Sequence, residues 1–298
     1  MVNIAEPCVT LVASTTIEPG IDQFMDLQWQ AEDAESVIEF AGRACYQSFS
    51  RPNPATANTD AYLRRTLFDQ GHWSIAEHAS ATFYITGVSR AFTHELVRHR
   101  HLSYSQLSQR FVDESSMSVV VPPALRNASD TSFLCDVGDS AVDAYDSIVS
   151  VLSRDGLSRK QAREAARAVL PNMTETRIVV TGNLRAWHEF CARRMQPDAD
   201  AEIQQIAGMI YKQLGIIAPS IFPDTENWGR KIQERKDLLN SLPEGSIVDV
   251  DGRGFALHGL WIDITKPAYG PELTAQRVAE LGSVKVLYTP TKPGGGEG

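Results

Sequence analysis

Alternating apolar and polar residues predict a strand early in the chain. Over residues 79–86 the apolar positions, among them Phe83, alternate with serine, threonine and tyrosine, as in a strand with one buried face. Gly87 is expected to end this strand. Ser89 then stands where it can cap a helix, and that helix is expected to end just before Arg98. The pattern therefore predicts a strand, a glycine turn and a short helix in succession.

Similar patterns predict elements elsewhere. Apolar residues at helical spacing predict helices at 31–46, 60–70, 142–152, 158–170, 183–195 and 203–217, and extended patterns predict strands at 9–14, 118–121 and 177–181. Ser158 and Gln161 form a capping-box pattern at the start of one of these helices. Residues 124–139, rich in Asn, Asp and Ser, are expected to form a loop, and Gly182 a turn.

The chain changes character after Pro223. Up to that point the predicted helices and strands are intermixed, which indicates one domain over residues 1–223. Residues 224–298 are expected to hold a linker, a small strand-rich appendage and a flexible tail. The elements predicted there are a charged helix at 230–239, a hairpin over 247–264, a helix at 273–281 and a strand at 284–288.

The composition is that of an ordinary globular protein. The chain has 298 residues, of which 43% are hydrophobic and 22% charged, and its formal net charge is -9. No apolar run is long enough to cross a membrane, and no secretory signal pattern is visible, so we expect a cytoplasmic protein without a membrane partner. The acidic balance disfavours nucleic acid as a partner of the whole molecule.

The four cysteines, at positions 8, 45, 135 and 191, show no Cys-x-x-Cys spacing. This argues against a zinc site or a disulfide framework, and we expect no bound metal. The cysteines are interpreted as small buried hydrophobic residues. The alternative, a nucleophilic thiol at Cys45 or Cys191, has no other support in the sequence.

Residues 98–110 are rich in hydrogen-bond donors for an acidic protein. They contain three arginines, two histidines, three serines, two glutamines and a tyrosine. Arg98, Ser108 and Arg110 suit a phosphate group, and Tyr104 with the neighbouring histidines suits a planar ring. The stretch is expected to be a loop that follows a helix end. A solvated basic turn is the alternative that the charge run alone favours.

Three further arginines bear on a ligand. Arg163 and Arg167 are one helical turn apart, so either an anion lies between them or one of them points elsewhere. Arg194 falls seven residues after Trp187, on the apolar side of its helix, where its guanidinium needs an acceptor. Backbone carbonyls at the helix end are an equally good acceptor on sequence grounds.

Several motifs, in the same order, resemble those of the flavin-dependent thymidylate synthases. The signature is Arg-His-Arg followed after seven residues by Ser, here at positions 98–100 and 108. Supporting motifs are Gly71-His72-x-Ser74-x-x-Glu77-His78, His94-Glu95-Leu96-Val97, Ala166-Arg167-Ala168-Val169-Leu170-Pro171 and Asn183-x-Arg185. The resemblance covers residues 9–222, so a chance match of one loop does not explain it.

The resemblance implies a fold, a reaction and an assembly. The expected fold is a mixed α+β domain of this family's type, followed here by the small C-terminal appendage. The expected enzyme is a methyltransferase that uses FAD, NADPH and methylenetetrahydrofolate to methylate deoxyuridine monophosphate (dUMP) at C5, giving dTMP. The expected assembly is a homotetramer with its sites at subunit interfaces.

The resemblance also implies roles for individual residues. The flavin is expected to contact Ser74, Arg98, His99, Arg100, Gln106, Asn183, Arg185 and Glu189. The nucleotide is expected to be surrounded by Arg90, Glu95, Arg98, Gln106, Leu107, Ser108, Gln109, Arg110, Arg167 and Arg194. Arg194 is the expected catalytic residue, because it matches the arginine that faces the pyrimidine edge and favours ionisation at N3, where a cation stabilises the developing negative charge. Ser108 is interpreted as a ligand contact, since no general base can be assigned to it.

Two positions depart from the family pattern. Glu189 stands where the family commonly has His or Asn, and Asp198 stands where it commonly has His. Both changes add a carboxylate near the expected site. They motivate an alternative reaction, the transfer of a hydroxymethyl group to C5 of dUMP or deoxycytidine monophosphate.

Two other classes of function are weaker alternatives. A nucleotide-binding or RNA-binding regulator could keep the basic stretch without turnover, and it would bind no flavin. A metal hydrolase that uses the clustered histidines is disfavoured, because neither His-x-x-x-His nor His-x-x-Glu-His occurs in the sequence.

Overall fold

The chain divides into two compact units, Met1–Pro223 and Asp224–Gly298. We refer to them as unit 1 and unit 2 and describe each by itself. The computed structural model describes residues 2–28, 31–223, 234–250, 253–258, 260–263, 275, 278 and 284–290. Within these residues, no helix combines the length and the apolar character that crossing a membrane requires.

Unit 1 is built on an antiparallel sheet of four strands in the order β2-β3-β6-β4. The strands are β2 (Cys8–Ser14), β3 (Ser80–Ser89), β6 (Glu175–Asn183) and β4 (Ser103–Gln106). The alternation predicted for residues 79–86 is confirmed, because Ala81, Phe83 and Ile85 are at most 1% exposed while the residues between them are not buried. The buried face of β3 is therefore the centre of the core.

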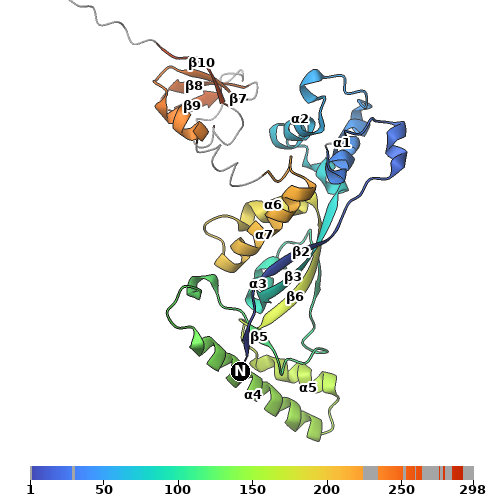
Figure 1. Cartoon of the computed structure of the whole chain (residues 1–298), viewed down its shortest axis with the longest axis vertical. Coiled ribbons are helices and arrows are strands. Elements are labelled where there is room, and N and C mark those ends of the chain that lie inside the picture. The colour runs from blue at the N-terminus through green and yellow to red at the C-terminus, as the bar shows by residue number, and fades with distance from the viewer. Residues whose placement is uncertain are drawn as a thin grey trace, which may run out of the picture. The chain divides into compact units, whose positions relative to one another are not determined.

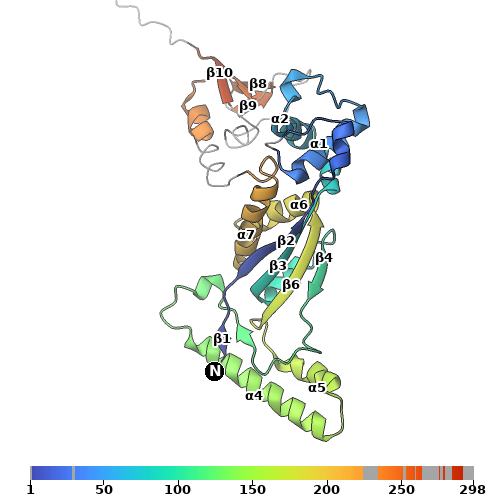
Figure 2. The same cartoon turned by 45° about the vertical axis from the view of Figure 1, so that its right-hand side comes forward.

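Helices cover the sheet and both of its ends. They are α1 (Asp33–Tyr46), α2 (Thr59–Leu63) with a π-helical turn at Arg64–Asp69, α3 (Arg90–Leu96), α4 (Ser132–Arg154), α5 (Arg159–Ala166), α6 (Leu184–Arg194) and α7 (Ala201–Ile217). Helices α6 and α7 lie alongside the sheet, whereas α1 and α2 lie near one end of its strands and α4 and α5 near the other (Figure 1, Figure 2). Buried residues of α1, α2, α3, α6 and α7 join β3 and β6 in one hydrophobic cluster.

Short elements complete unit 1. Five 3-10 helices occupy Pro19–Gln23, Pro54–Thr56, Trp73–His78, Pro123–Leu125 and Arg167–Val169 among the described residues. Strands β1 (Asn3–Ile4) and β5 (Ser118–Val119) form a parallel pair. Val119 of β5 packs with Val2 and with Ala141 of α4 in a second, smaller cluster.

The predicted helix starts are confirmed by their caps. The Ser89 hydroxyl accepts a hydrogen bond from the backbone N–H of Phe92 at 3.0 Å. Ser158 and Gln161 form the predicted capping box at the start of α5. Residue 183, predicted to begin a helix, is the N-cap of α6, and its side chain accepts from Ala186 N. These short polar side chains satisfy backbone donors that have no partner within the helix.

Two glycines were expected to end strands, and both predictions are wrong. Gly87 lies within β3 at a register shift, with φ +66°, and a Cβ there would overlap the carbonyl oxygen of Glu6. Gly182 lies within β6, paired with Ala81, and a Cβ there would overlap the Leu102 side chain. Glycine serves at both places for close approach of neighbouring groups rather than to reverse the chain.

The loop predicted over residues 124–139 is wrong from Ser132 onwards. Helix α4 already begins at Ser132, and the strand predicted for 118–121 is limited to Ser118–Val119. The polar residues there favour turns, but Gly138 lies closely against Val2 and Val119. Tertiary packing thus extends the helix into a segment of low intrinsic propensity.

The middle of the donor-rich stretch is a strand rather than the expected loop. β4 pairs with β6, so that Tyr104 is opposite Val180 and Gln106 opposite Ile178. The Tyr104 hydroxyl lies 2.8 Å from the carbonyl oxygen of Leu96 and 2.6 Å from that of His99, to which it donates. A four-residue edge strand of Ser, Tyr and Gln has too little apolar alternation to be recognised from sequence.

The cysteines are only partly as expected. All four are free thiols, but Cys8 and Cys45 are exposed, Cys135 is half-buried and only Cys191 is buried. Cys8 begins the edge strand β2, which is paired on one side only. The interpretation of all four as buried is therefore wrong for Cys8 and Cys45.

Unit 2 contains a second antiparallel sheet, in the order β10-β7-β8-β9. Its strands are β7 (Ile247–Val250), β8 (Arg253–His258), β9 (Leu260–Asp263) and β10 (Val284–Tyr288), and residues 234–241 are helical. The predicted hairpin is confirmed by the pairing of Val250 with Arg253. Leu239, Val248, Phe255, Trp261 and Val278 form its core. The predicted tail lies outside the described residues, as does most of the helix predicted at 273–281.

Candidate active site

Helix α6 follows directly from the central strand β6 and carries three groups of the candidate site. Asn183 is its N-cap, and Arg185, Glu189 and Arg194 follow along the helix. Trp187 and Phe190 anchor the face away from Arg185 and Glu189, which is the side from which Arg194 projects, and neither side chain is exposed to solvent. This burial fixes the rotation of α6 about its axis and hence the direction of its polar residues.

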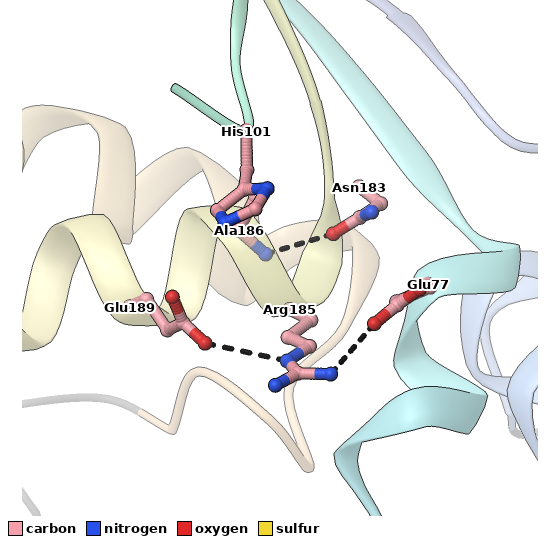
Figure 3. Close-up of a pocket in the computed structure, with 6 residues that line it drawn as sticks. All are labelled: Glu77, His101, Asn183, Arg185, Ala186 and Glu189. Atoms are coloured by element: carbon pink, nitrogen blue, oxygen red, sulfur yellow. Dashed lines mark hydrogen bonds and ion pairs between the residues drawn. The ribbon is translucent and has the colours of Figure 1, made fainter. Parts of the chain in front are cut away.

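Arg185 lies in a polar cavity of about 210 Å³ near the start of α6 (Figure 3). The cavity is lined by Glu77, His101, Asn183, Arg185, Ala186 and Glu189. The guanidinium donates from Nη1 to Glu77 Oε1 at 2.7 Å and from Nε to Glu189 Oε1 at 3.3 Å. The cavity therefore brings together the 3-10 helix Trp73–His78, the segment after α3 and the beginning of α6.

Arg194, at the other end of α6, reaches across to α3 and the residues after it. Its Nη1 donates to Glu95 Oε2 at 2.7 Å, its Nη2 to the carbonyl oxygen of Glu95 at 3.2 Å, and its Nε to His99 Nε2 at 2.9 Å. The Arg194 side chain is 19% exposed. Side-chain acceptors and one backbone carbonyl therefore share this guanidinium.

His99 is held neutral by its surroundings. Burial, followed by the positive charges of Arg194 and Arg193, lowers the pKa of His99 to about 4. Its ring meets Phe190 edge-on, with 5.0 Å between the ring centroids. A neutral imidazole can accept a hydrogen bond from an arginine, which a protonated one cannot.

The rest of the signature lies around β4. Arg98 and Arg100 are exposed, and their guanidinium groups form no hydrogen bond or ion pair with any other described residue. Gln106 Nε2 lies 3.2 Å from Thr93 Oγ1 and 3.3 Å from Thr176 Oγ1. The Tyr104 hydroxyl donates to backbone carbonyl oxygens of the preceding turn, so it is not available to bind a planar ligand.

The residues that follow β4 lead towards α5. Leu107 N donates to the carbonyl oxygen of Arg177 at 2.8 Å, which continues the pairing with β6. Ser108 is half-buried, Gln109 is 7% exposed, and Arg110 Nε lies 2.7 Å from Glu164 Oε2. Arg163 is turned towards Phe111 and Asp113, so it does not share an anion with Arg167.

A buried carboxyl that the sequence did not indicate lies close to Arg90. Glu114 is 5% exposed, and its Oε1 has no hydrogen-bond partner among the described residues. Burial raises the pKa of Glu114 to about 7, against the opposing effect of Arg90. Arg90 in turn experiences the charges of both Glu114 and Arg167. No spacing rule marks Glu114, because its burial arises from a turn between β4 and β5.

The structure thus gathers the predicted residues in three places. Glu95, His99 and Arg194 meet directly, Asn183, Arg185 and Glu189 share the cavity, and Arg90 lies near Arg167. Ser74 is exposed on the same 3-10 helix as Glu77, and Asp198 is exposed between α6 and α7. Glu77 was within a recognised motif but had no predicted role, and His101 was predicted only as a group suited to a planar ring. The structure places both in the lining of the cavity.

The fold and this arrangement define a mixed α+β protein with an arginine-rich site suited to a phosphorylated ligand. Residues 27–220 match the model of the family described as thymidylate synthase complementing protein. The flavin-dependent thymidylate synthase of Mycobacterium tuberculosis is 51% identical over 211 residues, which cover 67% of this chain and 84% of the relative. That of Mycobacteroides abscessus is 50% identical over 236 residues, covering 75% and 92%. The chain therefore belongs to the thymidylate synthase complementing protein family.

Proposed function

We propose that this protein is a flavin-dependent thymidylate synthase that converts dUMP to dTMP. It uses methylenetetrahydrofolate as carbon donor and NADPH as reductant through FAD. Two relatives with this name, each about 50% identical to this chain, support the assignment. In both cases the match covers more than four fifths of the relative. The hydroxymethyl alternative has no comparable support, because the relatives are named thymidylate synthases.

The observation that carries the proposal is the environment of Arg194. A guanidinium has five N–H donors, and Arg194 uses one on each of its three nitrogens for Glu95 and His99. Two donors therefore remain for a ligand, on a side chain that solvent still reaches. Because a cation with fixed donors stabilises negative charge in a half-buried site, Arg194 is proposed as the residue that favours ionisation of the pyrimidine at N3.

The nucleotide is proposed to extend from Arg194 to other arginines of unit 1. Its phosphate is assigned to Arg90, Arg98, Ser108, Arg110 and Arg167, and its base to Glu95, Gln106, Leu107, Gln109 and Arg194. The Arg98 guanidinium has no partner among the described residues. Arg90 and Arg167 are close enough for their like charges to repel each other, and a bound anion would relieve that repulsion. Guanidinium forks and a hydroxyl are the groups that bind phosphate well.

The donors of the cavity at the start of α6 fit part of a flavin nucleotide. A guanidinium, an amide and an imidazole line it, and the residues assigned to FAD are Ser74, Arg98, His99, Arg100, Gln106, Asn183, Arg185 and Glu189. When bound, FAD reduced by NADPH supplies the reducing equivalents of the methyl transfer. The protein's part is to bind and orient it.

The cavity around Arg185 is too small for the whole cofactor. The cavity of about 210 Å³ is below the roughly 300–1,000 Å³ of ordinary small-molecule sites. We therefore propose that neighbouring subunits complete the site in a homotetramer, which light scattering on the purified protein tests. A cytoplasmic location remains part of the proposal, and cell fractionation tests it.

The role of Arg194 is tested with Arg194→Ala and Arg194→Lys. Alanine removes both charge and donors, and we expect dTMP formation to fall about 100- to 1,000-fold, as for loss of a group that stabilises transition-state charge. Lysine keeps the charge without the planar fork and should restore only a small part of the activity. Mass analysis of the nucleotide product measures the methyl group transferred.

The matched control is Arg193→Ala, which removes the exposed neighbouring arginine of α6. It should retain activity within about threefold, since the charge of Arg193 is a smaller cause of the low pKa of His99 than burial and Arg194, which both remain. The absorption band of bound flavin must persist in all three variants. Full activity of Arg194→Ala with flavin bound would contradict the role of Arg194, and a hydroxymethyl product would contradict the reaction.

A further inference from the structure

Two carboxylates hold Arg185 in the cavity near the start of α6. Figure 3 shows Glu77 and Glu189 approaching the guanidinium from opposite sides. Glu77 comes from the 3-10 helix Trp73–His78, and Glu189 lies one turn further along α6. All three side chains are between 41% and 46% exposed, so a ligand can reach them.

This pairing opposes the binding of an anion. The lining residues include one guanidinium and two carboxylates, so the positive charge of Arg185 is more than compensated. Its Nε–H and one N–H of Nη1 are occupied, so three of its five donors remain. A phosphate that approaches Arg185 therefore meets two negative charges, and it can use Nε only by displacing Glu189.

The two pairs differ in strength. Glu77 accepts from Nη1 at 2.7 Å, a short charge-assisted hydrogen bond, whereas Glu189 accepts from Nε at 3.3 Å. The Glu189 pair also has the basic residue nearer the helix N-terminus, which is the weaker orientation for an i,i+4 pair. Glu189 is thus the partner that an incoming ligand displaces, while Glu77 keeps Arg185 in place.

We propose that Glu189 sets the affinity of this protein for FAD by competing with the cofactor for Arg185. The proposal rests on the proposed function, since it takes FAD as the ligand of this cavity. In the free protein Arg185 is paired with Glu189, and FAD binding replaces that pair with a contact to the cofactor. Glu189 therefore borders the bound cofactor, as assigned above, but its charge weakens cofactor binding.

The test is the FAD affinity of Glu189→Gln, measured on the full chain by quenching of flavin fluorescence. Glutamine keeps the size of the side chain and an oxygen acceptor for Arg185 Nε, so the substitution removes the charge alone. We expect FAD to bind about threefold to tenfold more tightly, which is the range for an exposed ion pair together with a like charge near the ligand. Circular dichroism checks that the variant is folded.

The matched control is Asp60→Asn. Asp60 accepts from Arg64 Nε at 2.7 Å in another exposed i,i+4 pair of unit 1, and neither residue lines the cavity. FAD affinity should be unchanged in this variant. Equal tightening in both variants would mean a general effect of net charge and would overturn the inference.

The remaining outcomes separate the inference from the function. Unchanged or weaker FAD binding by Glu189→Gln, beside measurable binding by the wild type, would overturn the inference and leave the proposed function standing. Absence of FAD binding in the wild type and in both variants would overturn the proposed function, and the inference with it. Activity measurements are not needed for either decision.

Discussion

At the scale of the residue, Glu114 is a carboxyl group whose burial is not offset by a full set of hydrogen bonds. It is buried, one of its oxygens lacks a partner among the described residues, and burial raises its pKa to about 7. Since its ordinary pKa is 4.5, the folded protein binds a proton that the unfolded chain releases between about pH 4.5 and pH 7. Stability must therefore fall as the pH rises through this range.

Glu114→Gln is expected to remove this pH dependence. The variant should match the wild type near pH 5 and should be more stable by about 1–3 kcal/mol at pH 8, where the wild-type carboxyl is ionised. Urea denaturation at a series of pH values measures the difference. Glu18→Gln, at an exposed carboxylate outside the site, serves as control. A difference that is the same at pH 5 and pH 8 would contradict the assignment of this proton to Glu114.

Residue roles were only partly accessible from sequence. The resemblance indicated that Arg194 and Arg185 contact a ligand, and a guanidinium that is not fully solvated needs hydrogen-bond acceptors. It could not indicate which acceptors, because Glu95 is 99 positions before Arg194 and the two meet only through the packing of α3 and α6. Glu114 carries no signal at all, since nothing in its sequence neighbourhood distinguishes a buried glutamate from an exposed one.

At the scale of the element, Gly87 shows how the sheet depends on one backbone conformation. Gly87→Ala introduces a Cβ at φ +66° that would overlap the carbonyl oxygen of Glu6, so either the bulge in β3 or its close approach to the segment before β2 must be lost. We expect a loss of more than about 2 kcal/mol in the free energy of unfolding. Chemical denaturation followed by circular dichroism measures it.

Gly208→Ala is the matched control for this substitution. Gly208 lies within α7, and no atom lies within 4 Å of an added Cβ. Alanine should stabilise the protein there by about 0.5–1 kcal/mol, because glycine is a poor helix former. If the two substitutions changed the free energy of unfolding by similar amounts, then neither the close contact with Glu6 nor the positive φ would explain why glycine is needed at position 87.

Elements were predictable where their own residues determine them. β3 shows clean alternation, α7 has a continuous apolar stripe, and α5 begins with a capping box. The errors occur where distant packing overrides local preference. The start of α4 depends on contacts with Val2 and Val119, and β4 exists only because β6 is available to pair with it.

At the scale of the whole molecule, the candidate site and the family match both fall within unit 1. The match spans residues 27–220, and every residue assigned to a ligand precedes residue 195. Unit 2 has a hydrophobic core of its own, around Phe255 and Trp261. The two units are therefore expected to be separable.

A chain ended after Pro223 is expected to fold and to bind FAD with an affinity within about threefold of the full chain, since unit 1 has a hydrophobic cluster made of its own residues. Fluorescence quenching measures the affinity, and calorimetry of the full chain should resolve a separate transition for unit 2. Loss of FAD binding by a folded, shortened chain would show that unit 2 takes part in the site.

The pairing of β3 with β6 also determines when the site can form. These neighbouring strands are separated in the sequence by β4, α4 and α5, so their alignment requires closure of a long segment. Contacts of such long range form slowly, and a chain emerging from the ribosome cannot make them until residue 183 is available. Asn183, Arg185 and Arg194 reach Glu77, Glu95 and His99 only after that event. A nascent or half-folded chain therefore has its arginines but no assembled site, and the ability to bind ligand arises together with the completed sheet.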